Sequence, residues 1–141
     1  MAALQISRPP PAVEVERWTL GAVTDLRDLR HALRDVLAER ADAGETADRV
    51  ALVATELAGN ALQHGLPPVE VHLLAAAGRW VIEVADHDPA HRPHLAEGGQ
   101  RRTGGRGLLI ATAVSDAIGW YPDGPAKRVW VAVPDGHRPG A

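Results

Sequence analysis

Three polar side chains in the middle of the chain have the spacing of a helical ridge. Glu56, Asn60 and His64 follow one another at intervals of four residues, and residues four apart lie on the same side of a helix. A carboxylate and a carboxamide one turn apart suit Mg²⁺, which takes few protein oxygens and fills its other positions with water and phosphate oxygens. A solvated helix face is the simpler explanation for one such pair, and His64 suits a structural role at the helix end. The ridge therefore needs support from other features.

Two further features have the residue types for nucleotide chemistry. Asp86 comes at the end of an apolar run and is followed by Asp88, although a turn that ends a strand also favours aspartate. Gly104-Gly105-Arg106-Gly107 precedes an apolar helical pattern. Unhindered backbone N–H groups and the positive end of a helix dipole at that point could bind phosphate. Glycines before a helix are also common as plain linkers.

A metal site is an alternative interpretation of the loop after Asp86. Imidazole and carboxylate groups, which are good ligands for transition metals, gather there: His87, Asp88, His91 and His94. Pro89 and Pro93 prevent a helix from fixing their spacing. We therefore favour a solvated loop over a metal site.

A short run of arginines in the same loop allows two interpretations. Arg101, Arg102 and Arg106 could bind phosphate or an acidic partner, because guanidinium groups match such oxygens in geometry. A solvated surface explains the charge run equally well.

Hydrophobic periodicity predicts the elements that position these residues. The expected elements are a strand ending at Leu20, helices from Ala22 to Gly44 and from Thr46 to Gly65, a hairpin of Val69–Leu74 and Trp80–Ala85, a loop from Asp86 to Gly105, a helix over Gly107–Ala117, and a hairpin of Ile118–Tyr121 and Arg128–Val133. Thr46 is the expected N-cap of the second helix. This order predicts an α+β fold, a two-layer α/β sandwich with helices on one face of a mixed, mostly antiparallel sheet.

Length and composition predict one domain between two short ends. The 141 residues are enough for one hydrophobic core, and we expect a flexible arm over residues 1–12, a domain over 13–134 and a flexible tail over 135–141. The absence of cysteine excludes disulfides and thiolate metal sites. A net charge of −3 argues against nucleic-acid binding. No apolar run is long enough to span a membrane, so we expect a cytoplasmic protein.

The order of these features resembles a known family. Residues 56–65, Glu-Leu-Ala-Gly-Asn-Ala-Leu-Gln-His-Gly, resemble the N-box of the histidine-kinase-like ATPases, the GHKL family with the Bergerat ATP-binding fold. Asp86 is similar to the aspartate of their first glycine box, and Gly105-Arg106-Gly107-Leu108 to the second. Within the family the chain most resembles the anti-sigma-factor serine/threonine kinases and related regulators, over Arg17 to Val133.

The resemblance implies ATP and Mg²⁺ as ligands, with a role for each matching residue. Asn60 would hold Mg²⁺ against the nucleotide phosphates, and Asp86 would accept a hydrogen bond from the adenine amino group. Glu56 would polarise the attacking hydroxyl as the catalytic base. The loop over Ala90–Thr103 would form a lid. The implied nucleotide-binding residues are Asn60, Asp86, Gly105, Arg106, Gly107 and Leu108.

The resemblance also implies protein partners. In the anti-sigma-factor kinases the hydroxyl belongs to a Ser or Thr of an anti-anti-sigma protein, so a sigma factor, such an antagonist or a second copy of the chain would be the partner. This sequence departs from the family at the first glycine box, which reads Asp86-His87-Asp88-Pro89-Ala90 where the family has Asp-x-Gly-x-Gly. The departure leaves a second hypothesis: a degenerate module of the same fold that binds a protein without using ATP.

Overall fold

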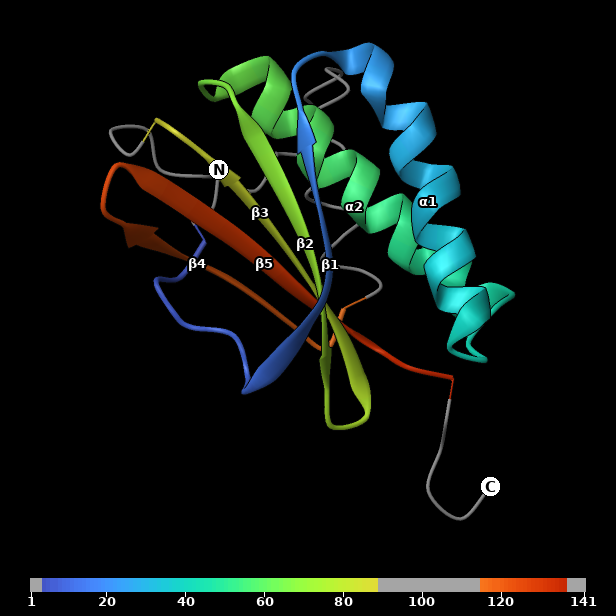
Figure 1. The fold of residues 1–141 in the computed structure, drawn as a ribbon. Coiled ribbons are helices and arrows are strands. Elements are labelled where there is room, and N and C mark those ends of the chain that lie inside the picture. The colour runs from blue at the N-terminus through green and yellow to red at the C-terminus, as the bar shows by residue number, and fades with distance from the viewer. Residues whose placement is uncertain (1–3, 89–114, 137–141) are drawn as a thin grey trace, which may run out of the picture.

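A computed structural model describes residues 4–88 and 115–136, and these form two helices packed on a five-stranded sheet (Figure 1). The sheet order is β1-β2-β3-β5-β4, and every pair of neighbouring strands is antiparallel. The elements are β1 (Ala12–Leu20), a 3₁₀ turn η1 (Val23–Asp25), α1 (Leu26–Glu39), α2 (Glu45–His64), β2 (Val69–Ala76), β3 (Arg79–Asp86), β4 (Ala117–Asp123) and β5 (Ala126–Pro134). Both helices cover the same face of the sheet. The predicted α+β two-layer architecture is confirmed.

The helices form where apolar residues recur at steps of three and four. In α1 the stripe of Leu29, Leu33 and Leu37 is buried against α2 and the sheet. The predicted end of the second helix at Gly65 is confirmed, because Gly65 is the C-cap of α2. Two other predicted ends were wrong: α1 ends at Glu39, and Gly44, not Thr46, is the N-cap of α2. Thr46 lies inside the first turn and is buried, so its hydroxyl does not cap the helix.

Strand β3 lies at the centre of the sheet, and every residue from Trp80 to Asp86 is buried. Its even-numbered side chains point toward the helices, where Ile82 packs with Leu73 of β2 and Val131 of β5 in the main core. On the opposite face, Val81 packs with Trp130 and other residues in a second, smaller cluster. A central strand buried on both faces favours apolar residues; β3 has one exception within Trp80–Ala85, Glu83, whose buried carboxylate accepts a hydrogen bond from the Tyr121 hydroxyl.

Residues 5–7 lie beside β4, although the sequence analysis predicted a flexible arm over residues 1–12. The backbone N–H of Ser7 donates to the Trp120 carbonyl at 2.9 Å, and Ile6 and Trp120 form a parallel bridge. The indole N–H groups of Trp120 and Trp130 donate to the carbonyls of Leu4 and Ser7, at 3.1 and 2.9 Å. Buried indoles need such acceptors, and this segment supplies them.

Two predictions concern the part of the chain that follows β3. The helix predicted over Gly107–Ala117 lies almost entirely outside the described residues, and its last residue, Ala117, begins β4 instead. The predicted final hairpin is confirmed, since β4 and β5 pair across a turn at Gly124. This hairpin brings the start of β5 beside the end of β3.

Candidate functional site

Asp86 ends β3 with its side chain on the helix-covered face, and the residue is only 4% exposed. Its Oδ1 accepts a hydrogen bond from the Asp88 backbone N–H at 2.8 Å, and the Leu66 backbone N–H also donates to the carboxylate. Burial raises the pKa of Asp86, and these two N–H groups together with the charge of Lys127 oppose that rise. The carboxylate is therefore a fixed and largely dehydrated acceptor.

The end of α2 approaches this carboxylate very closely. Gly65 is the C-cap residue of α2, and a Cβ atom built on it would lie 2.5 Å from Asp86 Cγ and 2.6 Å from Asp86 Oδ2. No real Cβ contact is that short, so only glycine allows the helix end to lie against the carboxylate. The sequence analysis predicted that Gly65 ends the second helix. The structure shows in addition that the absence of a side chain at Gly65 leaves room for the Asp86 carboxylate.

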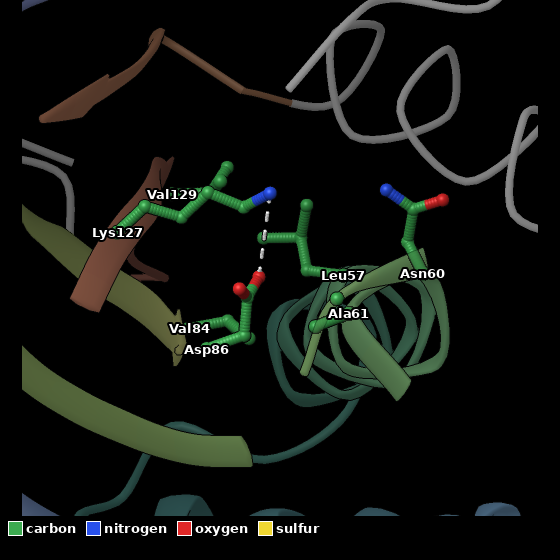
Figure 2. Close-up of a pocket in the computed structure, with 8 residues that line it drawn as sticks. Leu57, Asn60, Ala61, Val84, Asp86, Lys127 and Val129 are labelled. Atoms are coloured by element: carbon green, nitrogen blue, oxygen red, sulfur yellow. Dashed lines mark ion pairs between the residues drawn. The ribbon is translucent and has the colours of Figure 1, made fainter. Parts of the chain in front are cut away.

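Lys127 is the partner of Asp86 that sequence reasoning missed. The two residues are direct cross-strand neighbours on β5 and β3, with Lys127 Nζ 3.7 Å from Asp86 Oδ2 (Figure 2). Lys127 is 7% exposed. Strand alternation could have found it, because residue 127 has the same parity as the core valines Val129 and Val131.

A small pocket connects these groups to α2. Its lining residues come from α2, β3 and β5: Leu57, Asn60, Ala61, Gly65, Val84, Asp86, Lys127 and Val129. Asn60 lies at one side of the pocket, and the ion pair of Asp86 and Lys127 lies at the other (Figure 2). The volume is about 40 Å³, which suits a water molecule but is too small for a purine ring.

A larger cavity lies between the start of α1 and α2, with a volume of about 410 Å³. It is lined by Val23, Leu26, Arg30, Thr55, Glu56, Gly59, Asn60 and Gln63. Burial raises the pKa of Glu56, and the positive charge of Arg30 opposes the rise. A carboxyl with a raised pKa is a better proton acceptor when ionised. This volume lies within the range of small-molecule sites.

Asn60 lines both cavities and therefore lies between two other residues that the sequence analysis identified, Asp86 and Glu56. It shares the small pocket with Asp86 and the large cavity with Glu56. His64 is exposed in the last turn of α2 and lines neither cavity. Four predicted nucleotide-binding residues lie outside the described residues: Gly105, Arg106, Gly107 and Leu108.

The alternative metal site has no counterpart in residues 4–88 and 115–136, where no three histidine, aspartate or glutamate side chains gather as ligands. His87 Nδ1 lies 3.0 Å from the Pro68 carbonyl oxygen, and Asp88 is the backbone donor to Asp86. His91 and His94 lie outside these ranges.

A family model of the histidine kinase-like ATPase domain matches residues 21–132. The chain belongs to the histidine kinase-like ATPases. The match spans α1, α2 and most of the sheet, and therefore includes Glu56, Asn60, Asp86 and Lys127. All residues that line the two cavities lie within the matched range.

Two solved histidine kinase domains match this chain at low sequence identity. The Acinetobacter baumannii histidine kinase AdeS is 13% identical with a TM-score of 0.47, over 87% of this chain and 69% of that one. The domain from the Erythrobacter litoralis EL346 blue-light activated histidine kinase is 18% identical with a TM-score of 0.47, over 79% and 60% of the respective chains. Curated proteins gave no match. Among the described residues, no helix has the length and apolar character needed to span a membrane.

Proposed function

We propose that this histidine kinase-like ATPase is an ATP-binding regulator that transfers the γ-phosphate of ATP to a Ser or Thr of a partner protein, in the manner of the anti-sigma-factor kinases. The observation that carries the proposal is the position of Asn60 between two cavities, one with Asp86 and the other with Glu56. Asn60 of α2 thus lies between Asp86, which would bind the base, and Glu56, which would accept a proton.

The residues of the small pocket fit a purine nucleotide in their chemistry. Asp86 offers a fixed, buried acceptor for an exocyclic amino group, and Gly65 provides the close approach that a side chain would fill. The carboxamide oxygen of Asn60 suits Mg²⁺, which would retain water and phosphate oxygens in its other positions. When bound, Mg²⁺ would neutralise charge on the transferring phosphoryl group.

Glu56 supplies the proton acceptor for the transfer. Its carboxylate lines the larger cavity, which has room for a partner's side chain beside Asn60. The hydroxyl oxygen would bond to the γ-phosphorus as the bond from that phosphorus to the leaving ADP oxygen breaks, and Glu56 would take the hydroxyl proton. The partner would be a sigma factor's antagonist, with the sigma factor itself or a second copy of the chain as further partners.

A protein-binding module that does not use ATP is the second candidate function. The observation in its favour is the size of the pocket, because about 40 Å³ next to Asp86 does not admit a base. The absence of the family's two glycines after Asp86 also favours a module that does not use ATP, because glycines allow the backbone to approach a nucleotide closely.

Calorimetric titration with ATP, with and without Mg²⁺, separates the two functions. We expect Mg²⁺-dependent binding, with Asp86→Asn weakening it by about tenfold to a hundredfold because the charged acceptor becomes a neutral carboxamide with a donor group in place of one oxygen. Asn60→Ala should remove the Mg²⁺ dependence. Gln63→Ala is the matched control, since this second carboxamide of α2 lines only the larger cavity. Absence of heat at millimolar ATP would leave the protein-binding module.

A further inference from the structure

Lys127 lies in the space where a base would meet Asp86. The ladder of β3 and β5 places the two residues directly opposite each other, and both side chains point toward α2. Their charged atoms are 3.7 Å apart, and the side chains are 8% and 5% exposed. Leu57 and Val129 of the same pocket give this pair an apolar surrounding.

Among the residues that the structure describes, three groups besides Lys127 lie against the Asp86 carboxylate. The backbone N–H groups of Asp88 and Leu66 donate to it. Gly65 lies so close that an added Cβ would overlap Oδ2. On the pocket side, Lys127 Nζ faces Oδ2. An amino group of a base that reaches Oδ2 from the pocket would meet the lysine ammonium there.

We propose that Lys127 governs base binding in this pocket: its ammonium competes with the amino group of the base for Asp86, and its side chain must leave before a purine can enter. The inference rests on the proposed nucleotide-binding function and names the residue that sets its affinity. Separating a buried ion pair is unfavourable because it leaves a dehydrated charge without its partner. The intact chain should therefore bind adenine nucleotides more weakly than a variant without this ammonium.

Calorimetric titration of Lys127→Ala with ATP and Mg²⁺ tests the proposal directly. We expect binding about tenfold tighter than in the unmodified protein, or tighter still, because the space is opened and the competing charge is gone. Lys127→Met keeps most of the side chain's volume and removes only the charge, so it should tighten binding by less. Arg128→Ala is the matched control: it removes one positive charge at the next position of β5, where the side chain bonds to Asp123.

The outcomes separate this inference from the function on which it rests. If the unmodified protein binds ATP and both Lys127 variants bind equally or more weakly, the inference is overturned and the function stands. If neither the unmodified protein nor any Lys127 variant binds ATP, both are overturned. Thermal unfolding of each variant identifies any that fails to fold.

NMR of the unmodified protein tests displacement of Lys127 without a Lys127 substitution. Because Lys127 is the only lysine, selective ¹³C labelling at the lysine ε-carbon gives one ε-CH₂ signal in a heteronuclear NMR spectrum. We expect ATP to shift this signal toward its position in Asp86→Asn, where the carboxylate partner is absent. An ε-CH₂ signal that stays in place at saturating ATP would contradict displacement of the lysine.

Discussion

The two cavities that meet at Asn60 use the same kinds of residue in opposite surroundings. Each has a carboxylate whose pKa is raised by burial and a cation that opposes the rise, Asp86 with Lys127 and Glu56 with Arg30. Asp86 is buried beside a pocket of about 40 Å³, whereas Glu56 is half-buried beside a cavity of about 410 Å³. Under the proposed function this difference separates two roles: the buried Asp86 would be a fixed acceptor for recognition, while the larger cavity would let Glu56 meet an incoming reactant.

The largest effect that distinguishes the cavities is expected from Glu56→Gln. If Glu56 only accepts the hydroxyl proton, phosphate transfer to the cognate partner should fall by about 10²–10⁴-fold, the loss typical of a missing general base. ATP affinity should change little, because the substitution lies in the open cavity. Transfer and calorimetric affinity are measured on the same preparation, with Glu39→Gln on the exposed end of α1 as the charge-matched control. Unchanged transfer would remove Glu56 from the mechanism.

The enclosed pocket should be sensitive to added volume. Gly65→Ala places a Cβ within 2.5 Å of Asp86 Cγ and 2.8 Å of the Ala61 carbonyl oxygen. Overpacking at such a contact should lower the free energy of unfolding by about 1–3 kcal/mol. Urea denaturation measures this change, and ATP titration should show weaker binding because Asp86 is displaced. A variant of unchanged stability and affinity would mean that the contact is not tight in solution.

The open cavity should tolerate the same change. Gly59 lies inside α2, and a Cβ there would meet only Leu26 Cδ1, at 3.5 Å. Gly59→Ala should therefore raise the free energy of unfolding by about 0.5–1 kcal/mol, since glycine in a helix interior is less favourable than alanine. Urea denaturation alongside Gly65→Ala makes the comparison. Destabilisation by both substitutions would contradict the contrast between the cavities.

The smallest expected effect is a shift in pH dependence from Arg30→Gln. The pKa of Glu56 already lies above its ordinary value of 4.5, and Arg30 lowers it. Removing Arg30 should raise this pKa further, so the acid limb of the pH–rate profile for phosphate transfer should move to higher pH. A limb that stays in place or moves to lower pH would show that Arg30 does not act on Glu56.

The same raised pKa has a consequence for stability. The folded protein holds the Glu56 proton more tightly than the unfolded chain does, so the free energy of unfolding should decline as pH rises from 4.5 through the raised value. Glu56→Gln should remove this part of the decline, which urea denaturation at several pH values measures.

Local patterns were sufficient for the first two helices, the hairpins, and the positions of Glu56, Asn60 and Asp86 along their elements. The period of four puts Glu56 and Asn60 on one side of α2, and the end of an apolar run puts Asp86 at the end of β3. These are consequences of helix and strand geometry, which act between neighbours in the chain. The boundary between the two helices was less accurate: Gly44, predicted to end the first helix, is the N-cap of α2, and the predicted N-cap Thr46 lies inside the first turn.

Contacts between residues that are distant in the sequence could be found only from the tertiary structure. The contact of Gly65 with Asp86 depends on how α2 packs over β3, and the pairing of Lys127 with Asp86 depends on the antiparallel register of β3 and β5. The hydrogen bonds from Trp120 and Trp130 to the N-terminal segment span more than a hundred residues of sequence. The sheet order β1-β2-β3-β5-β4 sets these contacts. Periodicity specifies which face of an element is buried, but the neighbour on that face is chosen by packing between distant segments.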